Sequence, residues 1–141
     1  MKVMGLDVGS KTIGVAISDA FGWTAQGLTT IKWNESDIRS ADPLLKKIVA
    51  EHEVEQIVIG LPKHMNGSIG ERGLASQTYA THVEKIHQIP TFLWDERLST
   101  VAAERVLIEA DVSRKKRKTV IDKVAAVMIL QGFLDQSSRG V

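Results

Sequence analysis

Three acidic positions in this sequence could supply carboxylates to one site. Asp7 ends the first apolar stretch of the chain, the pair Asp95-Glu96 ends another, and Asp122 stands near the start of a long apolar segment. Carboxylates gathered from distant parts of a chain repel one another at neutral pH, and a hard divalent cation removes that cost. Mg²⁺ binds carboxylates, water and phosphate oxygens, and two such ions can stabilise the attacking and leaving oxygens of a displacement. The chemistry that fits is metal-dependent hydrolysis of a phosphodiester bond.

The turn after Asp7 contains glycine, and its sequence is Val8-Gly9-Ser10-Lys11-Thr12. Glycine allows backbone N–H groups to approach a phosphate or a metal-bound ligand closely. Each acid also has a purely structural interpretation. Asp7 can stabilise a tight turn, Asp95 and Glu96 can be a solvated pair, and Asp122 can interact with the positive end of its helix. The sequence leaves these alternatives open.

The composition limits the remaining classes of function. A length of 141 residues with 43% hydrophobic and 25% charged residues is typical of one globular domain, which we expect over 1–141. The absence of cysteine excludes disulfides, thiolate catalysis and zinc held by cysteine, so a metal site must use oxygen or histidine ligands. No apolar run approaches the roughly 18 residues of a membrane span, and no signal-peptide core follows Met1, so we expect a cytoplasmic protein.

Hydrophobic periodicity indicates the elements that must position these residues. Alternating apolar residues predict an antiparallel meander of three strands over 2–7, 13–18 and 27–31. Helical spacing and short apolar runs then alternate: helices over 42–52, 71–88, 99–108 and 120–136, and strands over 56–60 and 91–94. Three antiparallel strands followed by βα units predict an α/β fold, with a five-stranded mixed sheet covered by helices on both faces.

A basic run lies between the last two predicted helices. Arg114, Lys115, Lys116, Arg117 and Lys118 form five uninterrupted cations, which the net charge of +1 conceals. We expect this run to be a loop that attracts a phosphate backbone through counterion release, with a merely solvated loop as the alternative.

Histidine and tryptophan give no metal or stacking site in this interpretation. His52, His82 and His87 share no metal-ligand spacing and are expected to be surface or boundary residues on helices. Trp23, Trp33 and Trp94 could stack on bases, but packing in the interior is the commoner role of so few large aromatic side chains.

Four motifs, taken in order, resemble the YqgF family over nearly the whole chain. They are Asp7-Val8-Gly9 with Lys11-Thr12-Ile13-Gly14, Gly60-Leu61-Pro62 with Asn66-Gly67 and Gly70, Asp95-Glu96-Arg97-Leu98-Ser99-Thr100, and Asp122-Lys123-Val124-Ala125-Ala126 with Ile129-Leu130-Gln131. The resemblance implies an RNase H-like fold similar to RuvC Holliday-junction resolvases. Members of the family are described as junction resolvases or as nucleases that mature the 5′ end of precursor 16S rRNA.

The resemblance also implies roles for single residues. The family's acidic positions match Asp7, Glu96 and Asp122, which would be catalytic and would bind Mg²⁺ or Mn²⁺. Glu96 is preferred to Asp95 because the resolvase-like pattern places a glutamate at that strand end, and Ser99 stands where threonine is common, which keeps a hydroxyl.

Contacts to nucleic acid are expected from the same comparison. Lys11, Thr12 and Arg97 are expected to contact phosphates, Arg97 through a planar donor fork. In the loop after Pro62, which also carries Lys63, His64 and Asn66, Arg72 is the better candidate because it lies near a helix start.

Two other classes of function compete with the nuclease. An Asp-x-Gly turn also resembles the phosphate loop of actin-like ATPases and sugar kinases, but those clasp ATP between two related domains and this chain supplies one. A non-catalytic RNA-binding module in ribosome assembly is the second alternative. Precursor rRNA is preferred to a DNA junction on family grounds, while the choice between monomer and homodimer and between one and two metals stays open.

Overall fold

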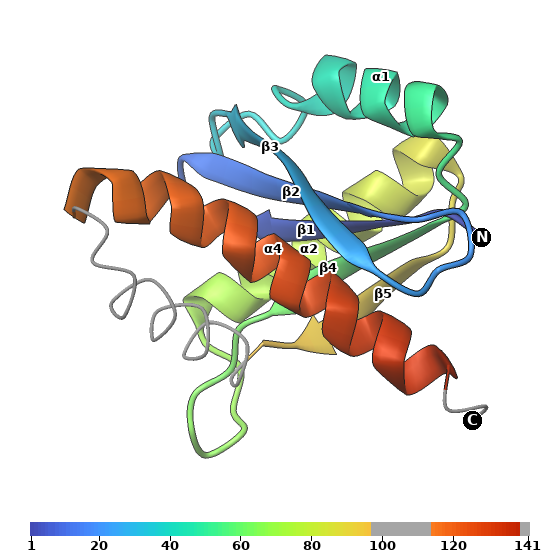
Figure 1. Cartoon of the computed structure of the whole chain (residues 1–141). Helices are drawn as coiled ribbons and strands as arrows, with labels where there is room; N and C mark the ends of the chain where they lie inside the picture. Colours follow the sequence, from blue (N-terminus) through green and yellow to red (C-terminus); the bar gives the residue numbers. More distant parts are fainter. Residues whose placement is uncertain (97–113, 139–141) are drawn as a thin grey trace.

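A five-stranded mixed sheet forms the centre of the computed structural model, which describes residues 1–96 and 114–138 and the side chains of 1–96 and 124–137 (Figure 1). Its strands are β1 (Val3–Val8), β2 (Thr12–Ser18), β3 (Ala25–Lys32), β4 (Gln56–Leu61) and β5 (Thr91–Asp95). They lie in the order β3-β2-β1-β4-β5. The pairs β1–β2 and β2–β3 are antiparallel, whereas β1–β4 and β4–β5 are parallel. The predicted mixed sheet is confirmed, including its three antiparallel strands followed by two parallel ones.

Helices cover both faces of this sheet, as the sequence predicts. They are α1 (Asp42–His52), α2 (Glu71–His87) and α4 (Arg114–Ser138). In Figure 1, α4 crosses one face of the sheet and contacts all five strands, while α1 and α2 lie on the other side. The described helices therefore enclose two separate apolar layers, one on each face.

The alternation of side chains along β1 assigns its residues to these two layers. Met4, Leu6 and Val8 belong to the core under α1 and α2, whereas Val3 belongs to the core under α4. Gly5 also faces α4, because a Cβ added to it would lie 2.7 Å from the Cβ of Leu130. Since successive strand residues point to opposite faces, Asp7 lies on the α4 face.

The helix boundaries follow local signals. Helix α1 has Pro43 in its first turn and ends at Glu53, which adopts the left-handed conformation with φ 52°. Helix α2 ends in the same way at Gln88, with φ 54°, and the N–H of Gln88 donates to the carbonyl of Glu84. Both helices begin where the sequence predicts, and their last residues differ from the predicted ones by at most one. None of the described helices has the length and apolar content that a bilayer crossing needs.

The basic run is not a loop, and this prediction was wrong. Residues Arg114 to Lys118 form the first turns of α4. Lysine and arginine are good helix formers, and no glycine or proline separates the run from the apolar part of the helix, so the helix begins six residues before the apolar pattern does. The helix predicted over 99–108 lies outside the described residues.

The three tryptophans have different environments. Trp33 and Trp94 pack against the two apolar cores, as expected. Trp23 is 69% exposed, so the expectation of interior packing was wrong for this residue. It lies in a tight turn whose N–H groups are bound by the carboxylate of Asp19, and its ring contacts Phe21 at a centroid distance of 5.5 Å.

The histidines on helices are boundary residues, in agreement with the sequence. His52, His82 and His87 are each half-buried. His82 Nε2 lies 2.9 Å from a carboxylate oxygen of Asp42, which joins α2 to the first turn of α1. This pair could not be predicted from sequence patterns because its members are 40 residues apart.

Candidate functional site

The carboxyl ends of β1, β4 and β5 meet at one edge of the sheet. Leu6 pairs with Ile59 and Gly60 pairs with Trp94, so Asp7, Gly60 and Trp94 form one row across three parallel strands. Neighbouring strands are about 4.8 Å apart, and ligands of open α/β sheets bind at these strand ends. The row therefore places Asp7 two strands from the end of β5, where Glu96 follows, with Gly60 of β4 between them.

The side chain of Glu96 lies above this row, on the face of the sheet that α4 covers. Its backbone N–H donates to the carbonyl of Leu61 at 3.2 Å, which extends the β4–β5 pairing by one residue. The carboxylate then lies so close above Gly60 that a side-chain atom there would overlap its Oε2. Asp7 and Glu96 thus belong to the same face of the sheet, with Gly60 between them.

The electrostatic environment of Glu96 disfavours its charged form. Burial raises the pKa of this carboxyl, the neighbouring Asp95 raises it further, and Arg72 lowers it, with a net result of about 7. A carboxylate that loses hydration next to another acid is stabilised when a cation binds beside it.

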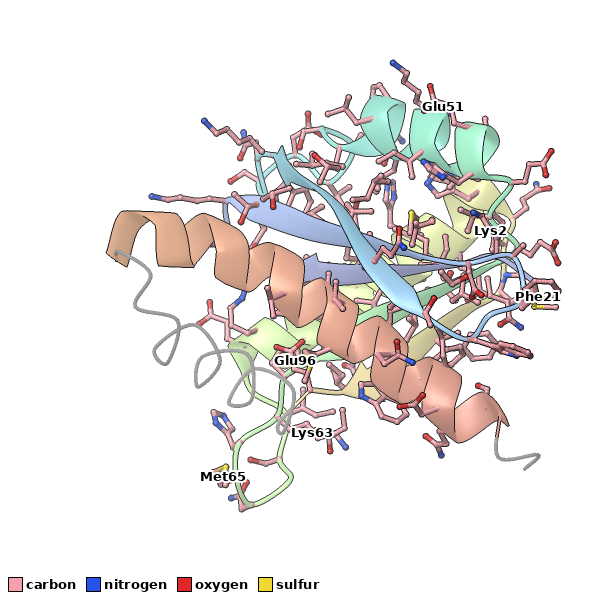
Figure 2. All side chains as sticks on the ribbon, viewed as in Figure 1. Lys2, Phe21, Glu51, Lys63, Met65 and Glu96 are labelled. Atoms are coloured by element: carbon pink, nitrogen blue, oxygen red, sulfur yellow. The ribbon has the colours of Figure 1, made fainter. Side chains whose placement is uncertain are left out.

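Asp95 occupies a different place. It follows Trp94 and precedes Glu96, so it points to the opposite face of the sheet. There its Oδ2 lies 4.0 Å from the Nζ of Lys63. Figure 2 shows Lys63 and Glu96 at this end of the sheet, with Phe21 at the other end. The structure therefore separates the two acids that the sequence left as alternatives and groups Glu96 with Asp7.

The backbone of α4 brings Asp122 toward the same place. The carbonyl oxygen of Ala126 would lie 3.2 Å from a Cβ on Gly5, which fixes where the helix crosses β1. Asp122 precedes Ala126 by one turn, about 6 Å along the axis, in the direction in which β1 runs from Gly5 to Asp7. Its side chain lies outside those that the structure describes.

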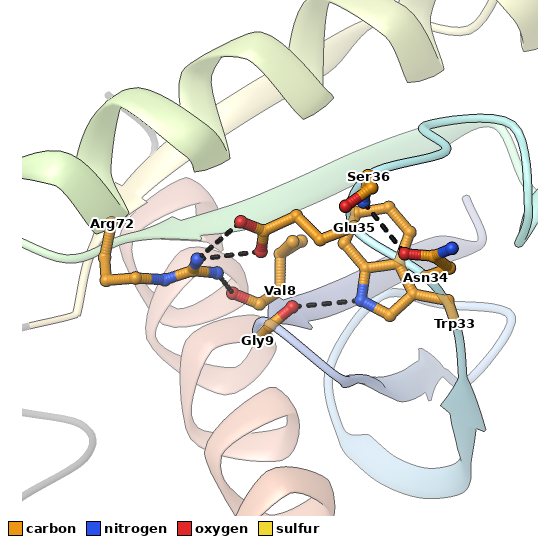
Figure 3. Close-up of polar contacts among 7 residues, drawn as sticks. All are labelled: Val8, Gly9, Trp33, Asn34, Glu35, Ser36 and Arg72. Atoms are coloured by element: carbon orange, nitrogen blue, oxygen red, sulfur yellow. Dashed lines mark hydrogen bonds and ion pairs between the residues drawn. The ribbon is translucent and has the colours of Figure 1, made fainter.

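The turn after Asp7 is held by Trp33, a residue that sequence reasoning did not include in the site. The indole Nε1 of Trp33 donates to the carbonyl of Gly9 at 2.9 Å (Figure 3), and its backbone N–H donates to the carbonyl of Lys11 at 3.1 Å. Within the turn, the N–H of Gly9 donates to the carbonyl of Thr12 at 2.8 Å. The ring of Trp33 packs edge-on against Tyr79 of α2 at a centroid distance of 4.9 Å. Trp33 thereby connects the backbone beside Asp7 to the apolar core under α2.

Arg72 lies at the start of α2 and contacts the end of β1. Its guanidinium donates to both carboxylate oxygens of Glu35, at 3.0 and 2.7 Å, and to the carbonyl of Val8 at 3.2 Å (Figure 3). Arg72 is therefore next to the acidic row and is already held by an acid that the sequence did not connect with it.

The other predicted contacts surround the same edge or lie outside the described region. Lys11 is exposed, and Thr12 is half-buried at the start of β2. A pocket of ≈ 240 Å³ opens beside the start of α2, with Lys63, His64 and Arg72 among its lining residues. Arg97 is not among the described residues, and the side chains of Arg114, Lys115, Lys116, Arg117 and Lys118 are not described either.

A hard cation suits the row of acids. Asp7 and Glu96 offer carboxylate oxygens on one face, and Gly60 leaves the space between them free of a side chain. A cation beside Glu96 would offset the burial and the neighbouring acid that raise the pKa of its carboxyl. Among the side chains that the structure describes, no three metal-binding groups cluster together. Asp122, the third acid, falls in the part of α4 for which only the backbone is described.

Comparisons with known proteins agree with this geometry. A family model described as "RuvX: Holliday junction resolvase" matches residues 1–136. A protein of Oceanobacillus iheyensis with the description "Putative pre-16S rRNA nuclease" is 71% identical over 136 residues, which covers 96% of this chain and 99% of that protein.

Solved structures of low sequence identity share the fold. RuvC of T. thermophilus, in complex with a Holliday junction substrate, aligns with a TM-score of 0.63 at 11% identity and covers 100% of this chain and 98% of that chain. The Fowlpox virus resolvase in complex with Holliday junction DNA aligns with a TM-score of 0.61 at 10% identity, covering 97% of this chain and 99% of that chain. These neighbours confirm the RNase H-like fold that the sequence resemblance implies.

Proposed function

Because this chain belongs to the RuvX family of Holliday junction resolvases, we propose that it is a divalent-metal-dependent nuclease that hydrolyses phosphodiester bonds in structured nucleic acid. The family also argues against the ATP-binding alternative. One observation supports the proposal most directly: Asp7 and the half-buried Glu96 lie on one face of the sheet, on either side of a residue without a side chain.

One group of residues would bind a divalent cation, and a second group would bind the substrate. We propose that Asp7, Glu96 and Asp122 hold Mg²⁺ or Mn²⁺. When bound, such an ion neutralises phosphate charge and lowers the pKa of water at the scissile bond. Glu96, desolvated and next to Asp95, gains most from that positive charge. Asp95 lies 4.0 Å from Lys63 on the other face, and we assign it no direct metal contact.

Basic residues around the acidic row would bind the substrate backbone. Arg72 and the exposed Lys11 lie next to the end of β1, and the first turns of α4 carry the run from Arg114 to Lys118. Together with Thr12 and Arg97, these groups form the proposed phosphate contacts. Phosphate contacts of this kind give affinity with little sequence preference, so the fold of the substrate would decide where the chain cuts.

We propose the 5′ end of precursor 16S rRNA as the substrate, because close relatives carry the description "Putative pre-16S rRNA nuclease". The second candidate is a four-way DNA junction, which the description of the family supports. A non-catalytic RNA-binding role in ribosome assembly is the third candidate, and the acids at the strand ends argue against it. Each candidate places the nucleic acid in the same compartment as the ribosome or chromosome, which is why we also propose a cytoplasmic location.

The experiment compares cleavage of labelled precursor 16S rRNA and of a labelled four-way DNA junction, each with Mg²⁺, Mn²⁺ or EDTA. The variants are Asp7→Asn and, as a matched control, Asp135→Asn, which removes an exposed carboxylate in the last turns of α4. We expect metal-dependent cutting by the wild type and by Asp135→Asn, and none by Asp7→Asn. The substrate that is cut faster identifies the physiological class. If the folded wild type binds RNA but cuts neither substrate with either metal, the nuclease is rejected and the binding module takes its place.

A further inference from the structure

Gly60 lies in the middle of the acidic row, and both sides of it are occupied. A Cβ built on this residue would overlap Oε2 of Glu96 and would lie 2.5 Å from Cδ1 of Ile129. Ile129 belongs to α4 and is fully buried in the core between that helix and the sheet. The carboxylate of Glu96 therefore packs directly against the Cα of Gly60.

The backbone at Gly60 gives no reason for glycine. The residue lies within β4, pairs with Trp94 and does not adopt a positive φ. Within a strand, alanine is at least as well tolerated as glycine, which loses more conformational freedom on folding. The absence of a side chain is thus explained by the space that its neighbours need.

The two neighbours would respond differently to a methyl group. Glu96 Oε2 is the free end of a flexible side chain at the sheet edge, so it can swing away at small cost in folding free energy. Ile129 is packed on all sides, so its displacement strains the core. A methyl group at Gly60 would therefore move the carboxylate of Glu96 more readily than it would move the helix.

We propose that Gly60 is a positioning residue for Glu96, and that its missing side chain keeps this carboxylate folded back toward Asp7, within reach of a shared divalent cation. The inference rests on the proposed metal-dependent nuclease. It adds that Gly60 decides, through its contact with Glu96, how well this carboxylate binds the ion. Supporting groups of this kind change metal affinity by about 10–100-fold when they are altered.

The test measures Mn²⁺ affinity by isothermal titration calorimetry and, separately, cleavage of the preferred substrate. The variants are Gly60→Ala, Ile129→Val and the double variant Gly60→Ala/Ile129→Val. Valine lacks the Cδ1 atom that meets the new methyl group, so the double variant relieves the core and keeps the conflict with Glu96. A further pair of variants, Glu96→Gln with and without Gly60→Ala, tests whether the glycine acts through Glu96 alone.

We expect Mn²⁺ to bind about 10–100-fold more weakly to Gly60→Ala and to the double variant, and cleavage to fall in parallel. Ile129→Val should bind Mn²⁺ as the wild type does. Adding Gly60→Ala to Glu96→Gln should cause no further loss of Mn²⁺ affinity, because both changes remove the same interaction.

Two results would overturn the inference, and they are distinguishable. Wild-type Mn²⁺ affinity in the double variant would reject the role of Gly60 while leaving the nuclease in place. Absence of Mn²⁺ binding and of cleavage in the wild type itself would reject the proposed function and this inference with it.

Discussion

Glu96→Gln is the substitution whose effect the structure specifies most fully. Glutamine keeps the shape of a protonated glutamate and removes its charge. In the folded protein, burial and the adjacent Asp95 raise the pKa of Glu96 from 4.5 to about 7. Because one pKa unit corresponds to about 1.36 kcal/mol, ionising Glu96 costs roughly 3 kcal/mol more in the folded protein than in the unfolded chain.

The sign of the pH dependence follows from the direction of this change. A carboxyl whose pKa is higher in the folded state binds its proton more tightly there, so it contributes stability that is fully present below about pH 4.5. That stability is lost as the pH rises to about 7, where the folded protein also releases the proton. In the absence of divalent metal, Glu96→Gln should therefore match the wild type near pH 4.5 and exceed it by up to roughly 3 kcal/mol at pH 8.

The assay is urea unfolding, followed by circular dichroism at several pH values between 4.5 and 8.5 in EDTA. Other titrating groups are common to both proteins and cancel in the difference between their free energies of unfolding. Glu55→Gln, which changes an exposed glutamate, is the matched control. Excess Mn²⁺ at pH 8 should stabilise the wild type more than it stabilises Glu96→Gln. A difference between the two proteins that stays constant from pH 4.5 to 8 would refute the reasoning.

Three further predictions concern the surroundings of the acidic row. Trp33→Phe keeps an aromatic ring and removes the hydrogen bond to the carbonyl of Gly9. The free energy of unfolding, measured in urea, should therefore fall by about 1 kcal/mol, and cleavage should slow. Unchanged values would show that this hydrogen bond does not stabilise the turn. Glu35→Gln removes the carboxylate that competes with phosphate for Arg72, so nucleic-acid affinity measured by fluorescence anisotropy should rise, and a weaker complex would contradict this. Replacing residues Arg114 to Lys118 by glutamine should lower the slope of log K against log salt by about 0.7–0.9 for each lost phosphate contact, and an unchanged slope would mean that the run does not bind substrate.

The parts of the fold that repeat a simple period were predictable from the sequence. Alternation predicted β1 and β2, and helical spacing with Pro43 predicted α1 from Asp42. The positions of Asp7 and Glu96 could also be predicted, because an acid that ends a buried strand must lie at the sheet edge where parallel strands end. These inferences need only local geometry and the rule that a short chain forms one sheet.

The contacts that complete the site could not be predicted in this way. Trp33 is 24 residues from Gly9, and Arg72 is 37 residues from Glu35. Which donor meets which acceptor depends on how α2 and the segment after β3 pack on the sheet, and no periodic pattern contains that information. The start of α4 was also misjudged, because apolar spacing reports which face of a helix is buried and does not report how far the helix extends into solvent.

Strand register determines which face of the sheet Asp7 and Glu96 occupy. A slip of one residue in β1 or β5 would move Asp7 or Glu96 to the face under α2. The pairing of β1 with β4 and of β4 with β5 runs without a register shift, whereas β2 and β3 contain one between Val15 and Ala16. The irregularity of the sheet therefore lies in the strand pair that carries none of the proposed metal ligands. The regular parallel strands, together with the close packing of α4 on Gly5 and Gly60, hold Asp7 and Glu96 on one face of the sheet, with Gly60 of β4 between them.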